Sequence, residues 1–194
     1  MFTGIISTTG KVKKAEFKNG ALYLTVSKPI TWAARAGDSI AIDGICLTAK
    51  KVSKTTLDFE LMPETIAKTN FSKQVFGEVN LERALTLKDG LSGHIVLGHI
   101  DTVGIIKSVK KAKEALVFTI QFPKEFASLV ASKGSVAIDG ISLTTIKPTS
   151  NQFSVSIVSY TQENTTLCQK GKGDVVNIEF DIVAKYLEKI CKKM

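Results

Sequence analysis

Short segments in which apolar and polar residues alternate occur along the whole chain. In residues 22–26, 57–61 and 176–180 every second residue is apolar, and more polar residues lie between them. A period of two is typical of strands that bury one face. Each half of the chain has about six such segments, separated by turns rich in Gly, Asn, Ser and Lys, which predicts antiparallel strands.

One of these alternating patterns occurs twice. Residues 39–48 read SIAIDGICLT and residues 135–144 read SVAIDGISLT, so the two copies differ only at Ile40/Val136 and Cys46/Ser142. Further segments match in the same order, such as 22–26 with 116–120 and 79–82 with 176–179. A repeat of about 95 residues is the size of a domain and too long for a solenoid. The sequence therefore contains two homologous domains.

The repeat predicts an all-β protein with two tandem six-stranded antiparallel barrels, related by internal duplication, and a C-terminal α-helix. A closed barrel is favoured over a sandwich because it leaves no strand edge exposed in so small a domain. We place the two domains at residues 1–88 and 94–181, followed by a helix at 182–194.

Helical segments interrupt the strands at matching places. Proline opens residues 29–36 and 123–130, as suits a first helical turn, and residues 63–69 and 160–165 predict a second pair of short helices or turns. The C-terminal tail has no counterpart in the first half. Its apolar residues recur at helical spacing: Val183, Tyr186, Leu187, Ile190 and Met194. This helix either packs on its own barrels or associates with other copies, and we favour self-association.

Composition narrows the function classes. The net charge is +8, but lysines are scattered and aromatic residues few, which favours a solvated basic surface over nucleic-acid binding. A basic two-barrel nucleic-acid module remains the weakest alternative. Three cysteines without CxxC spacing argue against a disulfide framework or zinc site. Neither a signal peptide nor a membrane-length apolar run is evident, so we expect a cytoplasmic protein without membrane contact.

The duplicated decapeptide is the first candidate site, because motifs of nucleotide, zinc-protease and serine-hydrolase sites are absent. Ile45 and Leu47 flank Cys46, so if they face the core, Cys46 and Thr48 face outwards. The same parity exposes the matching Ser142. A free cysteine is often a small buried core residue, which is the structural alternative. Outward Cys/Thr and Ser/Thr pairs at equivalent places predict two equivalent ligand sites.

The junction of the two halves, residues 90–101, is the second candidate. It is apolar but carries several glycines, which often mark close approach of another backbone or a ligand. In the register of the repeat, His99 stands where the first half has Ile5, which makes His99 a candidate general acid or base. We interpret His94 as a structural histidine. The spacing of the two histidines suits neither one face of a helix nor one face of a strand, so joint metal binding is disfavoured.

Two further polar pairs match between the halves, Thr65 with Thr161 and Asn80 with Asn177. They suit either turn and ladder caps or hydrogen bonds to a polar heterocycle or sugar chain, and the sequence leaves both readings open.

Taken in order, six motifs give the chain a family resemblance over essentially its whole length. They are MFTGI at 1–5, GICLT at 44–48, Glu64-Thr65 with Thr69-Asn70, VNLER at 79–83, GHIVLGHI at 93–100 and DGISLT at 139–144. With these motifs the chain resembles the riboflavin synthases of the lumazine-binding type.

The resemblance implies two Greek-key barrels and a homotrimer assembled through the C-terminal helix. Each barrel is expected to bind one 6,7-dimethyl-8-ribityllumazine, with the active site between the N-terminal barrel of one subunit and the C-terminal barrel of another. A four-carbon transfer between the two molecules gives riboflavin and 5-amino-6-ribitylamino-uracil, the last step of riboflavin biosynthesis. The enzyme would be a transferase without metal or cofactor, with lumazine synthase as a possible partner. The alternative is a non-catalytic, fluorescent lumazine- or flavin-binding protein.

The resemblance also implies functional residues. Catalytic roles fall on His99 and Ser142 for proton handling, Cys46 on the acceptor side, and Asp181. Cys46, Thr48, Thr65 and Asn80 are expected in the N-terminal pocket, and Gly98, His99, Ser142, Thr144 and Thr161 in the C-terminal one, with Lys133 and Asp181 nearby. The full substrate-binding set is Gly4, Ile5, Ile6, Ser39, Cys46, Leu47, Thr48, Glu60, Leu61, Met62, Glu64, Thr65, Asn80, Gly98, His99, Ile100, Lys133, Ser142, Leu143, Thr144, Ser156, Ile157, Val158 and Thr161. Ser159 and Tyr160 depart from the family pattern of Pro followed by His or Glu, which affects the C-terminal pocket.

Overall fold

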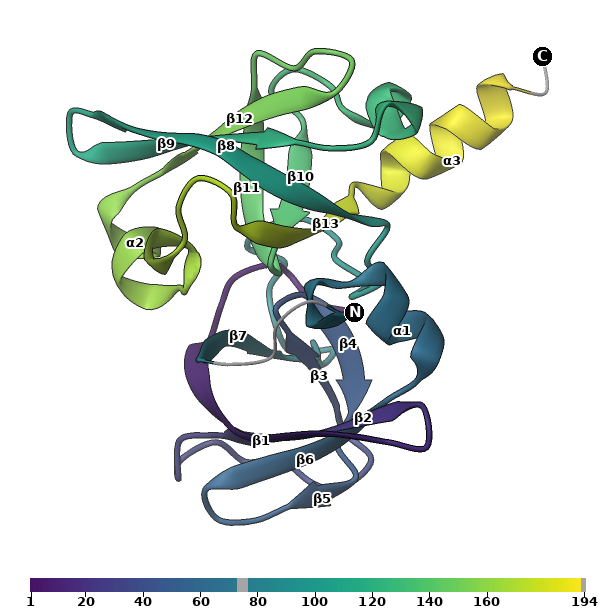
Figure 1. Ribbon diagram of the computed structural model, residues 1–194, viewed down its shortest axis with the longest axis vertical. Coiled ribbons are helices and arrows are strands. Elements are labelled where there is room, and N and C mark those ends of the chain that lie inside the picture. The colour runs from purple at the N-terminus through teal and green to yellow at the C-terminus, as the bar shows by residue number, and fades with distance from the viewer. Residues whose placement is uncertain (73–76, 193–194) are drawn as a thin grey trace.

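The chain forms two stacked β-barrels with a helix at the C-terminal end (Figure 1). The computed structural model describes residues 1–72 and 77–192. The first barrel is built from β1 (Thr8–Lys18), β2 (Ala21–Ser27), β3 (Ser39–Ile42), β4 (Ile45–Thr48), β5 (Lys51–Val52), β6 (Thr56–Leu61) and β7 (Glu78–Arg83). The second is built from β8 (Thr102–Ala112), β9 (Ala115–Gln121), β10 (Ser135–Ile138), β11 (Ile141–Ile146), β12 (Gln152–Ile157) and β13 (Val175–Phe180). The predicted all-β class with a duplicated unit and a terminal helix is confirmed.

The two barrels share one strand order and differ in one strand. The second is closed in the order β10-β11-β12-β9-β8-β13, with every pair antiparallel. The first is a seven-stranded sheet in the order β4-β3-β7-β1-β2-β6-β5, because the strand that matches β11 is divided into β4 and β5. The predicted closed, six-stranded barrel is therefore met by the second unit and not strictly by the first. The backbone N–H of Lys50 still donates to the carbonyl of Asp58 at 2.8 Å, so the divided strand stays beside β6.

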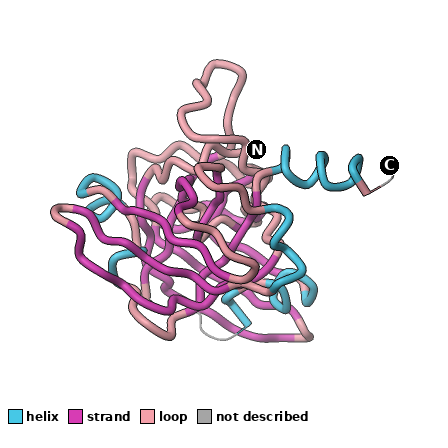
Figure 2. Tube along the Cα trace, turned by 90° about the horizontal axis from the view of Figure 1, so that it is seen from above, coloured by secondary structure: helices cyan, strands magenta, loops and turns pink. Residues whose placement is uncertain are grey.

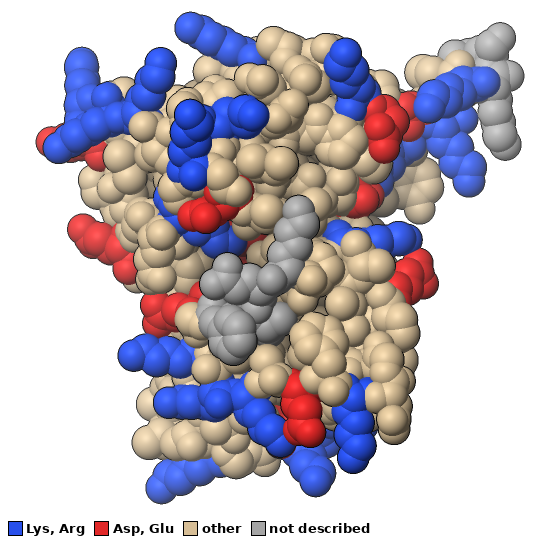
Figure 3. Space-filling model, viewed as in Figure 1, with Lys and Arg blue, Asp and Glu red and all other residues tan. Residues whose placement is uncertain are grey.

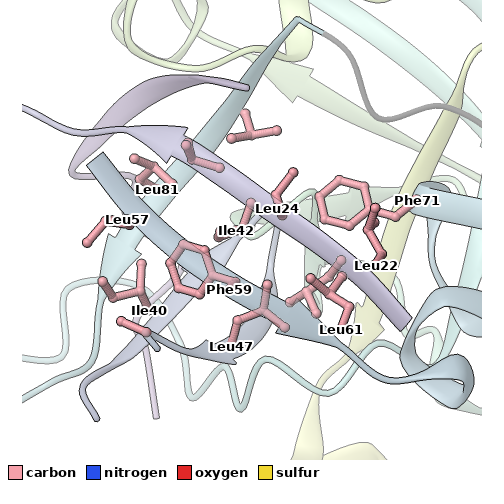
Figure 4. Close-up of a cluster of buried hydrophobic side chains, with 14 of the residues drawn as sticks. Leu22, Leu24, Ile40, Ile42, Leu47, Leu57, Phe59, Leu61, Phe71 and Leu81 are labelled. Carbon is pink, nitrogen blue, oxygen red and sulfur yellow. The ribbon is translucent and has the colours of Figure 1, made fainter. Parts of the chain in front are cut away.

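Each barrel encloses its own apolar core, supplied by the alternation seen in the sequence. Leu22, Leu24, Leu57, Phe59 and Leu61 are buried inside the first barrel, as Figure 4 shows, and the residues between them face outwards. In the second barrel the ring of Phe122 lies 5.5 Å from Phe153 and 5.7 Å from Phe180, measured between centroids. Burial of side chains of this size contributes about 1.5–3 kcal/mol each, which fixes the strand register.

The short helices follow the prediction except in one place. Helices α1 (Pro63–Lys68) and α2 (Ser159–Asn164) lie where expected, each followed by a 3₁₀ turn, η1 (Asn70–Ser72) and η3 (Leu167–Gln169). Residues 123–130 contain the 3₁₀ helix η2 (Lys124–Leu129). The matching residues 29–36 form no helix, so that prediction is wrong. There the ammonium of Lys28 binds the carbonyls of Trp32 and Lys54, both at 3.0 Å, and holds the segment as a loop.

Helix α3 (Ile182–Cys191) projects away from the strands, as Figure 2 shows. Its stripe of Val183, Tyr186, Leu187 and Ile190 is exposed in this chain, and Met194 lies outside the described residues. Contacts near its start hold it, including an ion pair of 2.6 Å between Lys185 and Asp101. No helix within the described residues has the length and apolar character needed to cross a membrane.

A two-fold arrangement of polar groups joins the barrels. The side-chain N–H₂ of Asn80 donates to the carbonyl of Asp139, and that of Asn177 donates to the carbonyl of Asp43, each at 2.9 Å. Between them Gly44 packs on Gly140, where an added Cβ on Gly44 would lie 2.6 Å from the Gly140 nitrogen. Asn80 is fully buried in this contact.

Candidate functional site

Two chain segments, one containing Gly4 and the other containing Gly98, cross from one barrel to the other and cover the duplicated strands. We call them the crossing segments. The carbonyl of Gly4 accepts a hydrogen bond of 2.8 Å from the N–H of Ser142 in the second barrel. The carbonyl of Gly98 accepts one of 2.9 Å from the N–H of Cys46 in the first. Between these segments Phe2 and Val96 form an isolated β-bridge. Each candidate site is therefore built from both halves of the chain.

Glycine is required at both crossings. Gly4 and Gly98 have φ angles of +76° and +81°, in the region that favours glycine. A Cβ on Gly4 would lie 2.7 Å from the Cβ of Ser142, and one on Gly98 would lie 2.5 Å from the Cβ of Cys46. This placement corrects the expectation that Gly98 and His99 accompany Ser142: they lie over the first barrel, beside Cys46. The expectation followed linear order along the chain, whereas the packing exchanges the two segments.

Ser142 has an imidazole partner, His94. The Nδ1 atom of His94 lies 2.7 Å from the Ser142 hydroxyl oxygen, and the histidine is buried. Burial lowers the pKa of His94 below its usual 6.5, and the negative charge of Asp181 opposes that shift. A neutral imidazole that is protonated at Nε2 accepts the serine proton at Nδ1. The arrangement can therefore move a proton between a ligand at Ser142 and the ring.

His99 lies elsewhere. Its side chain is exposed, and its backbone N–H donates to the carboxylate of Glu179 at 3.0 Å. The sequence favoured His99 because it replaces Ile5 in the repeat, and it assigned His94 to a structural role. The structure brings His94, and not His99, into contact with Ser142. No sequence pattern pointed to His94, because the contact joins residues that are far apart in the chain. In the structure the neighbouring Gly93 also approaches Ser142, where an added Cβ would lie 3.1 Å from the hydroxyl oxygen.

The Cys46 site shows the predicted parity. Ile45 and Leu47 are buried in the core, Cys46 is half-buried with a free thiol, and Thr48 is exposed. Ser39 pairs with Thr48 across β3 and β4, so these two residues share the outward face with Cys46. Thiol and hydroxyl groups thus share one face of the sheet, and Cys46 lies beside Gly98.

A polar cluster extends this outward face in the first barrel. The carboxylate of Glu60 accepts a hydrogen bond of 2.8 Å from the Tyr23 hydroxyl and forms an ion pair with Lys50. The Lys50 ammonium also lies 5.6 Å from the centre of the Tyr23 ring. Among these residues the sequence predicted Glu60 alone. The equivalent positions of the second barrel hold Val117, Ser156 and Ile146.

The remaining predicted residues fall into three groups. Leu47, Leu61 and Ile157 point into the cores, Ile6 packs on the second core and Ile100 on the first, and Leu143 packs partly on the second. Exposed or half-exposed positions at the outer face and beside the short helices are held by Ile5, Met62, Glu64, Thr65, Lys133, Thr144, Ser156, Val158 and Thr161. Asn80 differs from the others, because it is fully buried and both ends of its amide bind backbone of the second barrel.

A cleft of about 590 Å³ adjoins the predicted residues Ile5 and Ser39. It is lined by the start of the chain, by residues 33–34 and 38–40, and by the end of β7 with the loop that follows. Its charged residues are Asp38, Glu82, Arg83 and Asp89. Lys and Arg are otherwise spread over the face visible in Figure 3 and do not gather into one patch. Within residues 1–72 and 77–192 no cluster of three or more His, Cys, Asp or Glu is arranged to hold a metal ion.

Comparison with known proteins matches this architecture. A family model described as the lumazine binding domain matches twice, at residues 3–84 and 97–181. The riboflavin synthase of Mycobacterium tuberculosis is 40% identical over 99% of this chain and 98% of its own, and that of Schizosaccharomyces pombe is 36% identical over 98% and 93%. The crystal structure of LumP complexed with riboflavin superposes with a TM-score of 0.86 over 93% of this chain and 99% of its own, at 23% identity.

Proposed function

The chain belongs to the riboflavin synthase family, and we propose that it converts two molecules of 6,7-dimethyl-8-ribityllumazine into riboflavin and 5-amino-6-ribitylamino-uracil. This is a four-carbon transfer, so the protein is proposed to be a transferase. One observation carries the proposal: two equivalent crossings place different reactive groups, Ser142 with His94 at one and the Cys46 thiol at the other. A reaction between two identical substrates with unequal roles needs two similar pockets with different chemistry.

In the proposed mechanism the Ser142 site removes a proton from the C7 methyl group of one lumazine. The serine hydroxyl accepts this proton as it passes its own proton to Nδ1 of neutral His94, and the charge of Asp181 stabilises the resulting imidazolium. At the other site Cys46 assists addition of a nucleophile at C7 of the partner lumazine. Holding the two ring systems face to face supplies part of the acceleration, because it removes the entropic cost of their encounter.

A single assay tests the function. Purified protein is incubated with 6,7-dimethyl-8-ribityllumazine alone, and riboflavin absorbance is followed together with consumption of lumazine. We expect one riboflavin for every two lumazine molecules consumed. Tight fluorescent binding without turnover would instead support a non-catalytic lumazine- or flavin-binding protein, the alternative that the fold likeness to LumP keeps open.

We also propose that the protein assembles as a homotrimer through α3. Four apolar side chains of this helix are more than half exposed in the single chain: Val183, Tyr186, Leu187 and Ile190. A chain truncated after Asp181 is expected to be monomeric in light scattering, and an unchanged oligomer would refute this role for the helix.

Three finer expectations remain part of the proposal. We propose that residues 1–88 and 94–181 act as the two lumazine-binding domains and that residues 182–194 act as the assembly helix. The protein is proposed to act in the cytoplasm, which cell fractionation tests. Association with lumazine synthase is a further hypothesis, and co-purification of the two proteins tests it.

A further inference from the structure

A buried carboxylate holds the first crossing segment. Glu82 on β7 is 5% exposed and accepts three hydrogen bonds. The backbone N–H and the hydroxyl of Thr3 each donate to Oε1 at 2.7 Å, and the N–H of Gly4 donates to Oε2 at 3.0 Å. Since the carbonyl of the same Gly4 binds the N–H of Ser142, a continuous chain of contacts runs from Glu82 in one barrel to Ser142 in the other.

The second crossing has an equivalent carboxylate. Glu179 on β13 is 1% exposed and accepts hydrogen bonds from three successive backbone N–H groups, those of Leu97, Gly98 and His99, at 2.7, 2.8 and 3.0 Å. The carbonyl of Gly98 binds the N–H of Cys46. Glu179 in the second barrel is thus connected to Cys46 in the first.

Both carboxylates hold chain segments that pack tightly against the reactive residues. Burial raises the pKa of Glu82 and of Glu179, while the donated hydrogen bonds favour the charged form and limit the rise. The segments that they hold are the ones in which the glycines leave no spare room against Ser142 and Cys46. A shift of a few tenths of an ångström in either segment therefore moves a reactive group.

We propose that Glu82 and Glu179 are positioning residues of the reaction, with Glu82 acting on Ser142 and Glu179 acting on Cys46. The inference rests on the proposed function. Each carboxylate accepts from donors alone, and a glutamine in its place presents one oxygen and one N–H₂ group to the same donors. At least one hydrogen bond is then replaced by two donors facing each other, and the crossing segment moves away from its reactive residue.

The experiment compares E82Q and E179Q with E78Q as the matched control. Glu78 lies on the same strand as Glu82, but it binds Thr9 and Gln169 and not a crossing segment. Two readouts report the two sites without turnover. Alkylation of Cys46 by iodoacetamide, mapped by mass spectrometry, reports one site, and the imidazole NMR signal of His94 reports the other, since the chain has only two histidines.

We expect E179Q to change the alkylation rate of Cys46 about tenfold and to leave the His94 signal in place, whereas E82Q shifts the His94 signal and leaves the alkylation rate. Both should lower kcat about tenfold to a hundredfold with a smaller change in KM, as for loss of a hydrogen bond to a charged group. E78Q should match the wild-type chain in all three. Restoring the charge in E82D and E179D should recover part of each effect.

A purely structural role predicts a different pattern. If E82Q and E179Q alter both readouts alike, or neither, the proposal is wrong. If a glutamine variant fails to fold in a thermal melt, its aspartate counterpart takes its place in the same comparison, and the site-specific pattern decides. Absence of turnover in the wild-type chain would count against the proposed function, while the alkylation and NMR comparison would still test the two connections.

Discussion

The two barrels present the same decapeptide in the same backbone setting and surround its one variable polar position differently. Ser142 bonds to an imidazole that comes from the junction between the repeats. Cys46 meets the Gly98 backbone and the small apolar cluster of Phe2, Ala41 and Val96. The two repeats therefore share the backbone framework and differ in the groups that surround residues 46 and 142.

The outward faces differ as well. In the first barrel Tyr23, Glu60 and Lys50 form a charged, hydrogen-bonded cluster, whereas the second barrel has the smaller or apolar Val117, Ser156 and Ile146. The two buried interface amides do not differ in this way, since Asn80 and Asn177 each donate to a backbone carbonyl of the other barrel. Among these groups the difference therefore lies on the outward face of the barrels.

Substitution of His94 should have the largest effect on this comparison. His94→Gln removes the proton acceptor of Ser142 and should lower kcat about a hundredfold to ten-thousandfold, the range of general acid–base catalysis, with little change in lumazine binding. His99→Gln is the matched variant, because its side chain is exposed beside the other site. Steady-state kinetics of both variants check the assignment. A larger loss in His99→Gln would return the catalytic role to the histidine that the sequence favoured.

Next in size is the effect of the interface amides on stability. Asn80→Ala leaves the carbonyl of Asp139 and the N–H of Thr166 buried without their partner, so it should lower the free energy of unfolding by about 2–4 kcal/mol. Asn177→Ala should cost a similar amount, because its contacts mirror those of Asn80. Urea denaturation measures both, with the exposed Asn164→Ala as control. Unequal losses would show that the two-fold symmetry of the interface is geometric and not energetic.

The pH dependence gives the smallest effect. The pKa of His94 is lowered in the folded protein, so its neutral form contributes stability that is present above pH 6.5 and is lost as the pH falls towards the folded value. The acid limb of kcat should accordingly lie below pH 6.5. His94→Gln should remove the corresponding slope of stability against pH, measured by denaturation at several pH values. An acid limb above 6.5 would contradict neutral His94 as the acceptor.

Much of the fold follows from the sequence because its cause is local. Alternation of apolar residues in 57–61 sets one strand and its buried face, and the parity of Cys46 and Thr48 follows from the same rule. The prediction of a helix at residues 29–36 was wrong because the segment is held as a loop by Lys28. The partners of Lys28 are backbone carbonyls, which no local sequence pattern indicates.

The site depends on contacts between residues that are distant in the sequence, and these contacts could not be predicted from the sequence. A repeat shows that Gly4 matches Gly98, but not that each lies on the other barrel's strand. His94 looked structural because no periodicity connects it to Ser142. Family resemblance supplied candidate residues for the site but not the way in which the structure groups them.

The central claim is that the two sites differ in chemistry because of what lies around residues 46 and 142. Exchange of the two side chains, in the double variant C46S/S142C, tests it most directly in the riboflavin absorbance assay. The exchange keeps one thiol and one hydroxyl in the protein but moves the hydroxyl away from His94. We expect riboflavin formation to fall about a hundredfold or more while lumazine binding persists. Wild-type turnover in the exchanged protein would show that the sites are chemically equivalent and would contradict the account.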